Sequence, residues 1–189
     1  MVNPCIPLNT IRTNGTLKME QKGEILYITL PLQSKVLSFQ NMINDFAADV
    51  QITDNITFTD ENLQEKIVNN YVEKQIIDSE PPKFINIFYN RIAYDKNFSR
   101  VIKNSNAIDI DNKLEVDLRK IFNSEEKILY QIVSAVVHIG NSADCGHYVS
   151  VVKKNEKWYI CNDSSVKIIS NPINELAHGS IFLLERIDK

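Results

Sequence analysis

The chain has 189 residues, 43% of them hydrophobic, and a formal net charge of −3. This length suits a single domain over residues 1–189 with its own hydrophobic core, and the composition excludes a disordered chain. Lys and Arg are dispersed among acidic residues, which gives no reason to expect a nucleic-acid partner. No run of about 18 apolar residues is present that would span a membrane.

The first residues and the cysteines bear on cellular location. The start, Met-Val-Asn-Pro-Cys-Ile-Pro, has neither the basic region nor the apolar core of a signal peptide. The 3 cysteines lack the spacing of a disulfide framework, and an odd number favours reduced thiols. We therefore expect an intracellular protein, cytoplasmic or nuclear. The sequence favours no particular oligomeric state.

The first half of the chain contains one predicted strand and two predicted helices. Ile25–Leu32 is predicted to be a strand, and Ser38–Ala48 a helix capped by the Ser38 hydroxyl. Asp60–Val68 is predicted to form another short helix. The apolar face of the 38–48 helix consists of Phe39, Met42, Ile43 and Phe46.

The second half is dominated by strands. Val116–Phe122 is predicted to be a helix or a turn, and a weak helix is expected after Asn171. Alternating or continuous apolar patterns predict five strands, at Phe84–Tyr89, Ile132–His138, Tyr148–Val152, Trp158–Cys161 and Ile181–Leu184. The whole pattern predicts an α+β fold, mostly antiparallel sheet with a few short helices.

The segment Ser134–Val166 carries most of the chemical information. A buried strand leads into a polar loop ending in Cys-Gly-His-Tyr, and a hairpin returns with Asn-Asp. Gly146 places a residue without a side chain directly before His147, where a substrate backbone can pass close to the imidazole. His138, at the end of the apolar strand, is instead predicted to be a structural residue.

The register of this hairpin decides which side chains meet. If Lys154 faces Lys157 across the turn, His147 and Asn162 are diagonal neighbours on one face. Such neighbours are about 7–8 Å apart at the backbone, within reach of side chains that lean together. An imidazole acting as a general base needs a group that holds its other nitrogen, which an amide oxygen provides. A shift of one residue inverts the face and brings Asp163 beside the ring instead, and the sequence leaves both registers open.

Five short motifs follow one another in an order that resembles the histidine box of the ubiquitin-specific proteases. These cysteine enzymes cleave after the C-terminal Gly-Gly of ubiquitin. The motifs are Val136-Val137-His138-x-Gly140, Ser142-Ala143-Asp144, Gly146-His147-Tyr148-Val149-Ser150, Lys157-Trp158-Tyr159 and Asn162-Asp163-Ser164-Ser165-Val166. Tyr27–Leu32, Pro82–Asp95 and Gly179–Arg186 resemble further strands of that family, although Ile92 stands in a place where the family has Phe. The resemblance covers nearly the whole chain and the C-terminal part of the family's domain.

The resemblance implies a fold, a reaction and a set of site residues. The fold would be the palm and fingers part of a papain-like cysteine protease. His147 would exchange the proton, Asn162 would align His147, and Asp163 would help to position donors or water for the oxyanion. The substrate would be bound by Gly146, Tyr148 and Asp144. The partner would be ubiquitin or a ubiquitinated protein, and Tyr94–Asn104, by default a solvated loop, would contact the ubiquitin tail.

The nucleophile of that family lies in an Asn-Thr-Cys-Tyr/Phe box, and this sequence contains no such box. Cys5 lies between two prolines that oppose a helix N-terminus able to activate a thiol. Cys145 lies in the loop that resembles the family's substrate-covering segment. Cys161 is predicted to be a small buried residue of the second hairpin strand. None of the three is predicted to be the nucleophile.

No metal or other cofactor is predicted. Many members of the family carry two Cys-x-x-Cys zinc knuckles. At the corresponding places this chain has Thr10–Gly15 and Asn69–Lys74, which contain no cysteine or histidine. A site made of Cys145, His147 and His138 lacks a structural zinc spacing and a fourth ligand.

Two functions remain open at this point. The chain is either part of a thiol-dependent deubiquitinase whose nucleophile comes from other residues, or an inactive relative that binds ubiquitin or a partner. The retained His147, Asn162 and Asp163 favour the first function, and the absent cysteine box favours the second.

Overall fold

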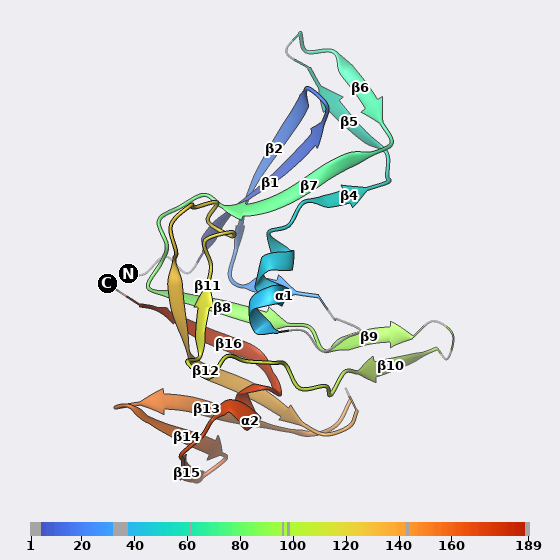
Figure 1. Cartoon of the computed structure of the whole chain (residues 1–189). Helices are drawn as coiled ribbons and strands as arrows, with labels where there is room; N and C mark the ends of the chain where they lie inside the picture. The colour runs from blue at the N-terminus through green and yellow to red at the C-terminus, as the bar shows by residue number, and fades with distance from the viewer. Residues whose placement is uncertain are drawn as a thin grey trace. The chain divides into compact units, whose positions relative to one another are not determined.

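The computed structural model describes residues 5–31, 38–60, 62–95, 97, 99–142 and 144–187. These residues form two compact units, and Figure 1 labels most of their elements. The first unit draws on the ranges Met1–Leu26, Ile43–Pro81 and Leu118–Lys127, and the second on Tyr27–Met42, Pro82–Asp117 and Ile128–Lys189. That residues 1–189 form a single domain stays a prediction.

The first unit is built around a four-stranded antiparallel sheet in the order β2-β1-β7-β4. Its strands are β1 (Ile6–Asn14), β2 (Leu17–Ile25), β7 (Tyr71–Ile77) and β4 (Val50–Ile52). A separate hairpin joins β5 (Ile56–Thr59) to β6 (Glu65–Val68). None of these strands was predicted from the sequence, although Ile25 was assigned to a strand.

The hairpin β5–β6 overturns the predicted helix over Asp60–Val68. One carboxylate oxygen of Asp60, Oδ1, accepts hydrogen bonds from the backbone N–H groups of Asn62 and Gln64, at 2.9 and 3.0 Å. This Asx-type contact closes a turn, in which Leu63 has a φ of 61°. The side-chain contact therefore competes successfully with helix formation.

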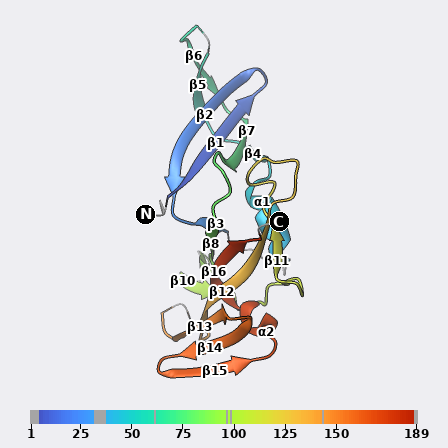
Figure 2. The same cartoon turned by 90° about the vertical axis from the view of Figure 1, so that its left-hand side faces the viewer.

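The second unit contains an eight-stranded sheet in the order β15-β14-β13-β12-β16-β8-β3, with β11 paired to β12. All neighbouring strands are antiparallel except β3 and β8. Figure 2 shows β13, β14 and β15 as consecutive ribbons of this sheet. The strands are β3 (Ile28–Leu30), β8 (Phe84–Tyr89), β11 (Glu115–Asp117), β12 (Leu129–Ile139), β13 (His147–Lys154), β14 (Lys157–Asn162), β15 (Ser165–Ile169) and β16 (Gly179–Arg186).

Side chains that alternate along these strands form the core of the second unit. Phe182 and Leu184 of β16 are fully buried, as are Ile87 of β8 and Ile132 of β12. The ring of Phe39 lies 4.7 Å from that of Phe182. Burial of every second side chain is the physical basis of the sequence prediction of these strands.

Two helices and a small hairpin complete the described residues. Helix α1 (Phe39–Phe46) confirms the predicted helix, and the Ser38 hydroxyl accepts a hydrogen bond from the N–H of Asn41 at 3.2 Å. Helix α2 (Ile173–Leu176) follows β15 and precedes β16. Strands β9 (Ile92–Asp95) and β10 (Arg100–Lys103) form a hairpin where a loop was expected.

Two further expectations need correction. Val116 lies in β11, and turns follow at 119–123, so the turn alternative for the 116–122 segment holds. The strand predicted over 25–32 is divided, because β2 ends at Ile25 and β3 begins at Ile28. Leu32 lies outside the described residues. The expectation of a mostly antiparallel sheet with few helices is confirmed.

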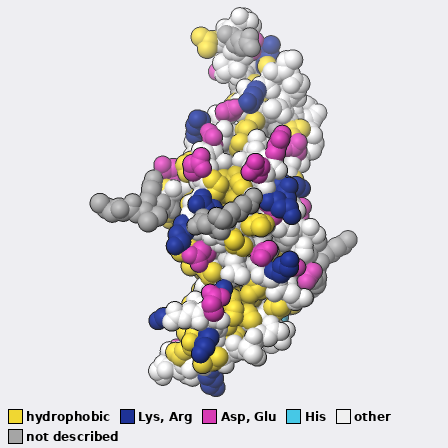
Figure 3. Space-filling model, turned by 60° about the vertical axis from the view of Figure 1, so that its left-hand side comes forward, with side chains coloured by type: hydrophobic (Ala, Val, Ile, Leu, Met, Phe, Trp, Pro, Cys, Tyr) yellow, Lys and Arg dark blue, Asp and Glu magenta, His cyan; other side chains and the backbone are white. Residues whose placement is uncertain are grey.

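The surface charges and the helices bear on other classes of partner. On the face shown in Figure 3, basic and acidic side chains are interspersed with apolar ones. Among the described helices, none has the length and apolar character needed to cross a membrane.

Candidate active site

The hairpin of β13 and β14 has the register that the sequence analysis considered first. Lys154 is paired with Lys157, and the ladder continues to Ser150 and Cys161. The turn residues Asn155 and Glu156 have φ values of 50° and 57°. A two-residue turn with both residues in the left-handed region matches the twist of antiparallel strands. The alternative register, shifted by one residue, is not formed.

This register brings His147 and Asn162 together. The distance between Nε2 of His147 and Oδ1 of Asn162 is 2.6 Å. With the amide oxygen as acceptor, Nε2–H donates, and the neutral ring keeps its lone pair on Nδ1. The described part of the chain offers Nδ1 no hydrogen-bond partner. The ring is thus held by one nitrogen and leaves the other available to accept a proton.

Asp163 lies beside the same ring but farther away. Its Oδ2 is 3.8 Å from Nε2 of His147, beyond hydrogen-bond distance, and its side chain is 79% exposed. The residue begins the turn to β15 with a φ of 49°, a conformation that Asp tolerates. Asn162 is therefore the group in direct contact with the imidazole. Asp163 forms an ion pair with the ring only when the ring is protonated.

Gly146 is required by packing against the protein itself. A Cβ at this position would be 2.1 Å from Nε2 of His138 and 2.5 Å from the carbonyl oxygen of Ile139. The φ of 156° also favours glycine. The face of Gly146 on which the Cβ would lie is thus occupied by β12. The close approach of a substrate backbone at Gly146 stays a prediction.

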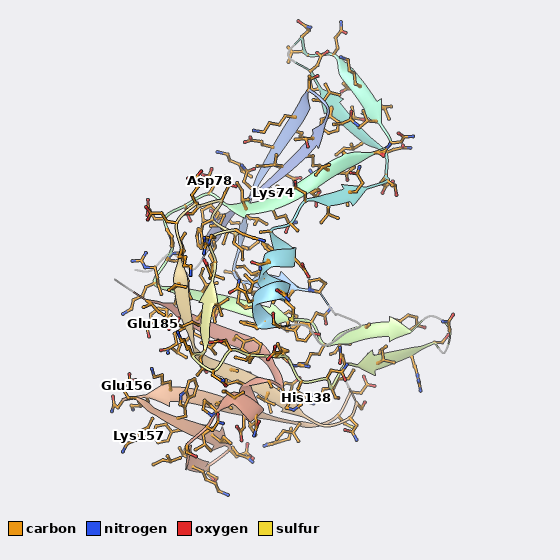
Figure 4. The ribbon with its side chains drawn as sticks, viewed as in Figure 1. Lys74, Asp78, His138, Glu156, Lys157 and Glu185 are labelled. Carbon is orange, nitrogen blue, oxygen red and sulfur yellow. The ribbon has the colours of Figure 1, made fainter. Side chains whose placement is uncertain are left out.

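The rings of His138 and Tyr148 pack against each other. Their centroids are 4.7 Å apart, and the two residues are paired across β12 and β13. Figure 4 shows His138 near the end of β12. Partial withdrawal from water, followed by the charge of Lys103, lowers the pKa of His138 below its usual value. Because Tyr148 is itself 64% exposed, one edge of this pair faces solvent.

Asp144 lies in the loop between β12 and β13 and is exposed. Its backbone N–H donates to the hydroxyl of Ser142 at 3.1 Å. Within the described residues it forms no hydrogen bond or ion pair with His147. The structure therefore unites His147, Asn162 and Asp163, places Gly146 and Tyr148 on either side of His147 in the chain, and leaves Asp144 apart.

A cavity of about 530 Å³ adjoins Asn162. Val137, Val149 and Ile160 contribute apolar walls, and Arg91 and Lys103 lie at its polar side. Most of the exposed wall surface is apolar, although most of the lining residues are polar or charged, and concave sites that combine both kinds of group are typical binding sites. The His147–Asn162 pair thus lies next to a space that can receive a ligand.

No disulfide joins the three cysteines, and within the described residues none of them is hydrogen-bonded to His147. Cys161 precedes Asn162 on β14, so its side chain points to the opposite face of the strand. Cys145 is exposed in the loop, and Cys5 lies in the other compact unit. The described residues do not pair a thiol with the imidazole.

The two segments compared with zinc knuckles lie side by side. Thr13 of β1 is paired with Val72 of β7. Arg12 and Glu73 form an ion pair between the same strands at 2.7 Å. Among the described residues, no group of three or more His, Cys, Asp or Glu side chains is placed to hold a metal ion.

Two supporting cations were missed by the sequence analysis. Arg91 is 4% exposed, and its guanidinium donates to the carbonyl oxygens of Asn104, Asn106, Ala177 and Gly179. Lys103 donates to the carbonyl oxygens of His138 and Gly140. All six acceptors are backbone carbonyls. Because these two cations are not paired with acidic side chains at these contacts, no residue pattern in the sequence identifies their partners.

Comparison with known proteins gives a consistent family match. The family described as ubiquitin carboxyl-terminal hydrolase matches residues 9–184. Ubiquitin carboxyl-terminal hydrolase 4 of Arabidopsis thaliana is 31% identical over 108 residues, which cover 57% of this chain and 29% of that protein. Human ubiquitin carboxyl-terminal hydrolase 5 is 38% identical over 58 residues, 31% of this chain and 6% of that protein.

Solved structures share the fold at low sequence identity. A chain of the SAGA Ubp8 DUB module bound to ubiquitin aldehyde has a TM-score of 0.80 and 16% identity, covering 97% of this chain and 41% of that chain. Another structure of the SAGA Ubp8 DUB module has a TM-score of 0.71 with 16% identity and covers 97% and 38%, respectively. The present chain thus spans less than half the length of these matching proteins.

Proposed function

Because the chain belongs to the ubiquitin carboxyl-terminal hydrolase family, we propose that it forms the histidine-bearing part of a deubiquitinase-type thiol protease domain. The reaction is hydrolysis of the bond after the C-terminal glycine of ubiquitin. The observation that carries the proposal is the 2.6 Å contact between Nε2 of His147 and Oδ1 of Asn162. In the terms of such a domain, residues 1–189 comprise its palm and fingers.

His147 is the general acid and base of the proposed reaction. Nδ1 takes the proton of a cysteine thiol, and the resulting thiolate attacks the carbonyl carbon of the terminal glycine. The imidazolium then returns the proton to the leaving amine, and a thioester remains. Water hydrolyses the thioester with Nδ1 as base, which releases the ubiquitin carboxylate and restores the thiol.

Asn162 and Asp163 have different roles in this proposal. Asn162 accepts the hydrogen bond from Nε2–H, which fixes the tautomer with a free Nδ1. Asp163 stabilises the imidazolium at 3.8 Å and helps to position donors or water for the oxyanion. Because its side chain is 79% exposed, solvent screens the first of these effects.

The nucleophile and the substrate complete the proposal. The cysteine comes from residues outside the present sequence, because none of the three described thiols contacts His147. Ubiquitin is the proposed partner, with Gly146, Tyr148 and Asp144 facing its C-terminal segment. No cofactor takes part in this reaction.

The experiment uses three forms of ubiquitin with the present chain: unmodified ubiquitin, ubiquitin lacking the terminal Gly-Gly, and a probe with a C-terminal electrophile. We expect saturable binding of the first, at least tenfold weaker binding of the second, and no adduct with the third. A tenfold change corresponds to about 1.4 kcal/mol of binding free energy. Binding is measured by calorimetry and adducts by mass spectrometry.

Equal affinity for ubiquitin with and without Gly-Gly would contradict recognition of the C-terminus. An adduct that maps to Cys5, Cys145 or Cys161 would place the nucleophile within this chain and overturn that part of the proposal. Binding without an adduct is also expected of the alternative, an inactive ubiquitin-binding relative, so the hydrolysis assay with His147→Ala is needed to separate the two.

A further inference from the structure

At the end of β12 that supports His147, no described strand is paired on the side opposite β13. The last residue pair between β12 and β16 is Val137 with Gly179, whereas β12 continues to Ile139. On its other side, β12 remains paired with β13 up to Ile139 and His147. The end of β12 that is paired with His147 therefore extends beyond its pairing with β16.

Lys103 provides hydrogen-bond donors at this place. Its Nζ donates to the carbonyl oxygens of His138 at 2.9 Å and Gly140 at 2.5 Å. His138 lies in β12, and Gly140 lies in the bend directly after the strand. An ammonium group with three donors can serve both acceptors at once. Lys103 thus binds two backbone carbonyls that lie beyond the last residue pair between β12 and β16.

Lys103 itself is anchored in β10 and partly withdrawn from water. It ends the ladder with β9, where it is paired with Ile92. Desolvation, followed by the charge of Arg91, lowers the pKa of Lys103 below its usual value. Partial desolvation of this kind strengthens charge-assisted hydrogen bonds to the protein.

The residues that Lys103 binds contact both chain neighbours of His147. The imidazole of His138 fills the space where a Cβ of Gly146 would lie, and it packs on the ring of Tyr148 at 4.7 Å. A movement of the β12 end is thereby transmitted to the residues before and after His147. The contact to Asn162 comes from a different strand, so it depends on this alignment.

We propose that Lys103 is a positioning residue for His147, whose ammonium holds the end of β12 against β13 and so keeps the imidazole in contact with Asn162. The catalytic meaning of this role rests on the proposed function, whereas the positioning itself is a property of the free chain. Within the described residues, Lys103 forms no hydrogen bond with His147 and acts through the 138–140 segment.

The test compares Lys103→Met with Lys103→Arg, which keeps the charge and several donors. Lys153→Met is the matched control. Lys153 donates to Gln131 and forms an ion pair with Glu156, but it has no described bond to the 138–140 segment. The readouts are amide hydrogen exchange along β12 and β13, and the 15N spectrum of the His147 imidazole. Both are measured on the chain alone.

For Lys103→Met we expect protection of the Ile139 and His147 amides to fall about tenfold or more, with protection of Ile132 unchanged. The imidazole signals should shift from a single Nε2–H tautomer toward the mixture of a free histidine. Lys103→Arg should restore most of the protection and the tautomer, and Lys153→Met should leave both as in the parent chain. Should Lys103→Met fail to fold, Lys103→Gln carries the same expectation.

Unchanged imidazole signals in a folded Lys103→Met or Lys103→Gln variant would overturn the proposal. A general loss of protection that includes Ile132 would also overturn it, because that result indicates a purely structural role. Neither readout needs ubiquitin or a nucleophile. A chain that fails to bind ubiquitin would contradict the proposed function and leave this test intact.

Discussion

Replacing His147 with alanine is expected to lower ubiquitin hydrolysis by about 10²–10⁴-fold, the usual contribution of a general acid–base group. The physical reason is that His147 is the described side chain that Asn162 holds by one ring nitrogen while the other nitrogen stays available to accept a proton. The measurement is kcat/KM for the hydrolysis of a fluorogenic amide at the C-terminus of ubiquitin. The enzyme combines this chain with the segment that supplies the proposed nucleophilic cysteine.

The affinity for ubiquitin should change little in the same variant, because His147 is proposed to act on the proton rather than on binding. Lys154→Ala is the control, since Lys154 is exposed at the turn end of the hairpin, away from His147, and does not line the cavity beside Asn162. Its rate should equal that of the parent enzyme. An unchanged rate for His147→Ala would remove His147 from the mechanism.

Replacing Arg91 with methionine is expected to lower the free energy of unfolding of the second unit by about 2–6 kcal/mol. Two of its four hydrogen bonds, to Ala177 and Gly179, are buried, and each buried acceptor left without a donor costs about 1–3 kcal/mol. The guanidinium also lies 4.8 Å from the ring centroid of Tyr89. Urea unfolding with an unchanged m-value measures the loss.

Lys83→Met is the control for this substitution. Lys83 forms an ion pair with Glu185 at 3.5 Å, and its side chain is 65% exposed. An exposed pair of this kind contributes about 1 kcal/mol or less. Arg91→Lys should fall between the two, because an ammonium cannot span four carbonyls. A loss below about 1 kcal/mol for Arg91→Met would show that the freed carbonyls find other donors.

The parts of the fold that the sequence predicts are those with a local signal. The β13–β14 hairpin has alternating side chains and a polar turn, and α1 has both an apolar face and the Ser38 cap. Strand β8 has buried residues at every second position. In each case, a pattern within about ten residues reports the burial that tertiary packing produces.

The missed strands have weak local signals. In β2 the described residues are mostly exposed and alternate charges rather than apolar side chains, so the backbone ladder with β1 is what defines the strand. The β5–β6 hairpin was mistaken for a helix because its turn depends on one carboxylate, that of Asp60. Such strands become visible only when their partners are known.

The candidate site divides in the same way. The meeting of His147 with Asn162 follows from one of two registers considered in the sequence, and the turn conformation selects it. Lys103 and Arg91 bind backbone carbonyls, which every residue has, so no sequence pattern identifies their partners. The roles of the site residues, and the intracellular location, stay predictions.

The central claim is that the C-terminus of ubiquitin lies against the His147–Asn162 pair. Ubiquitin carrying a nitroxide spin label on its C-terminal glycine, added to the 15N-labelled chain, reports this contact through paramagnetic broadening. We predict the strongest broadening at His147, Tyr148 and Asn162, and its loss with reduced label. Strongest broadening elsewhere, with the signals of these three residues intact, would contradict the account.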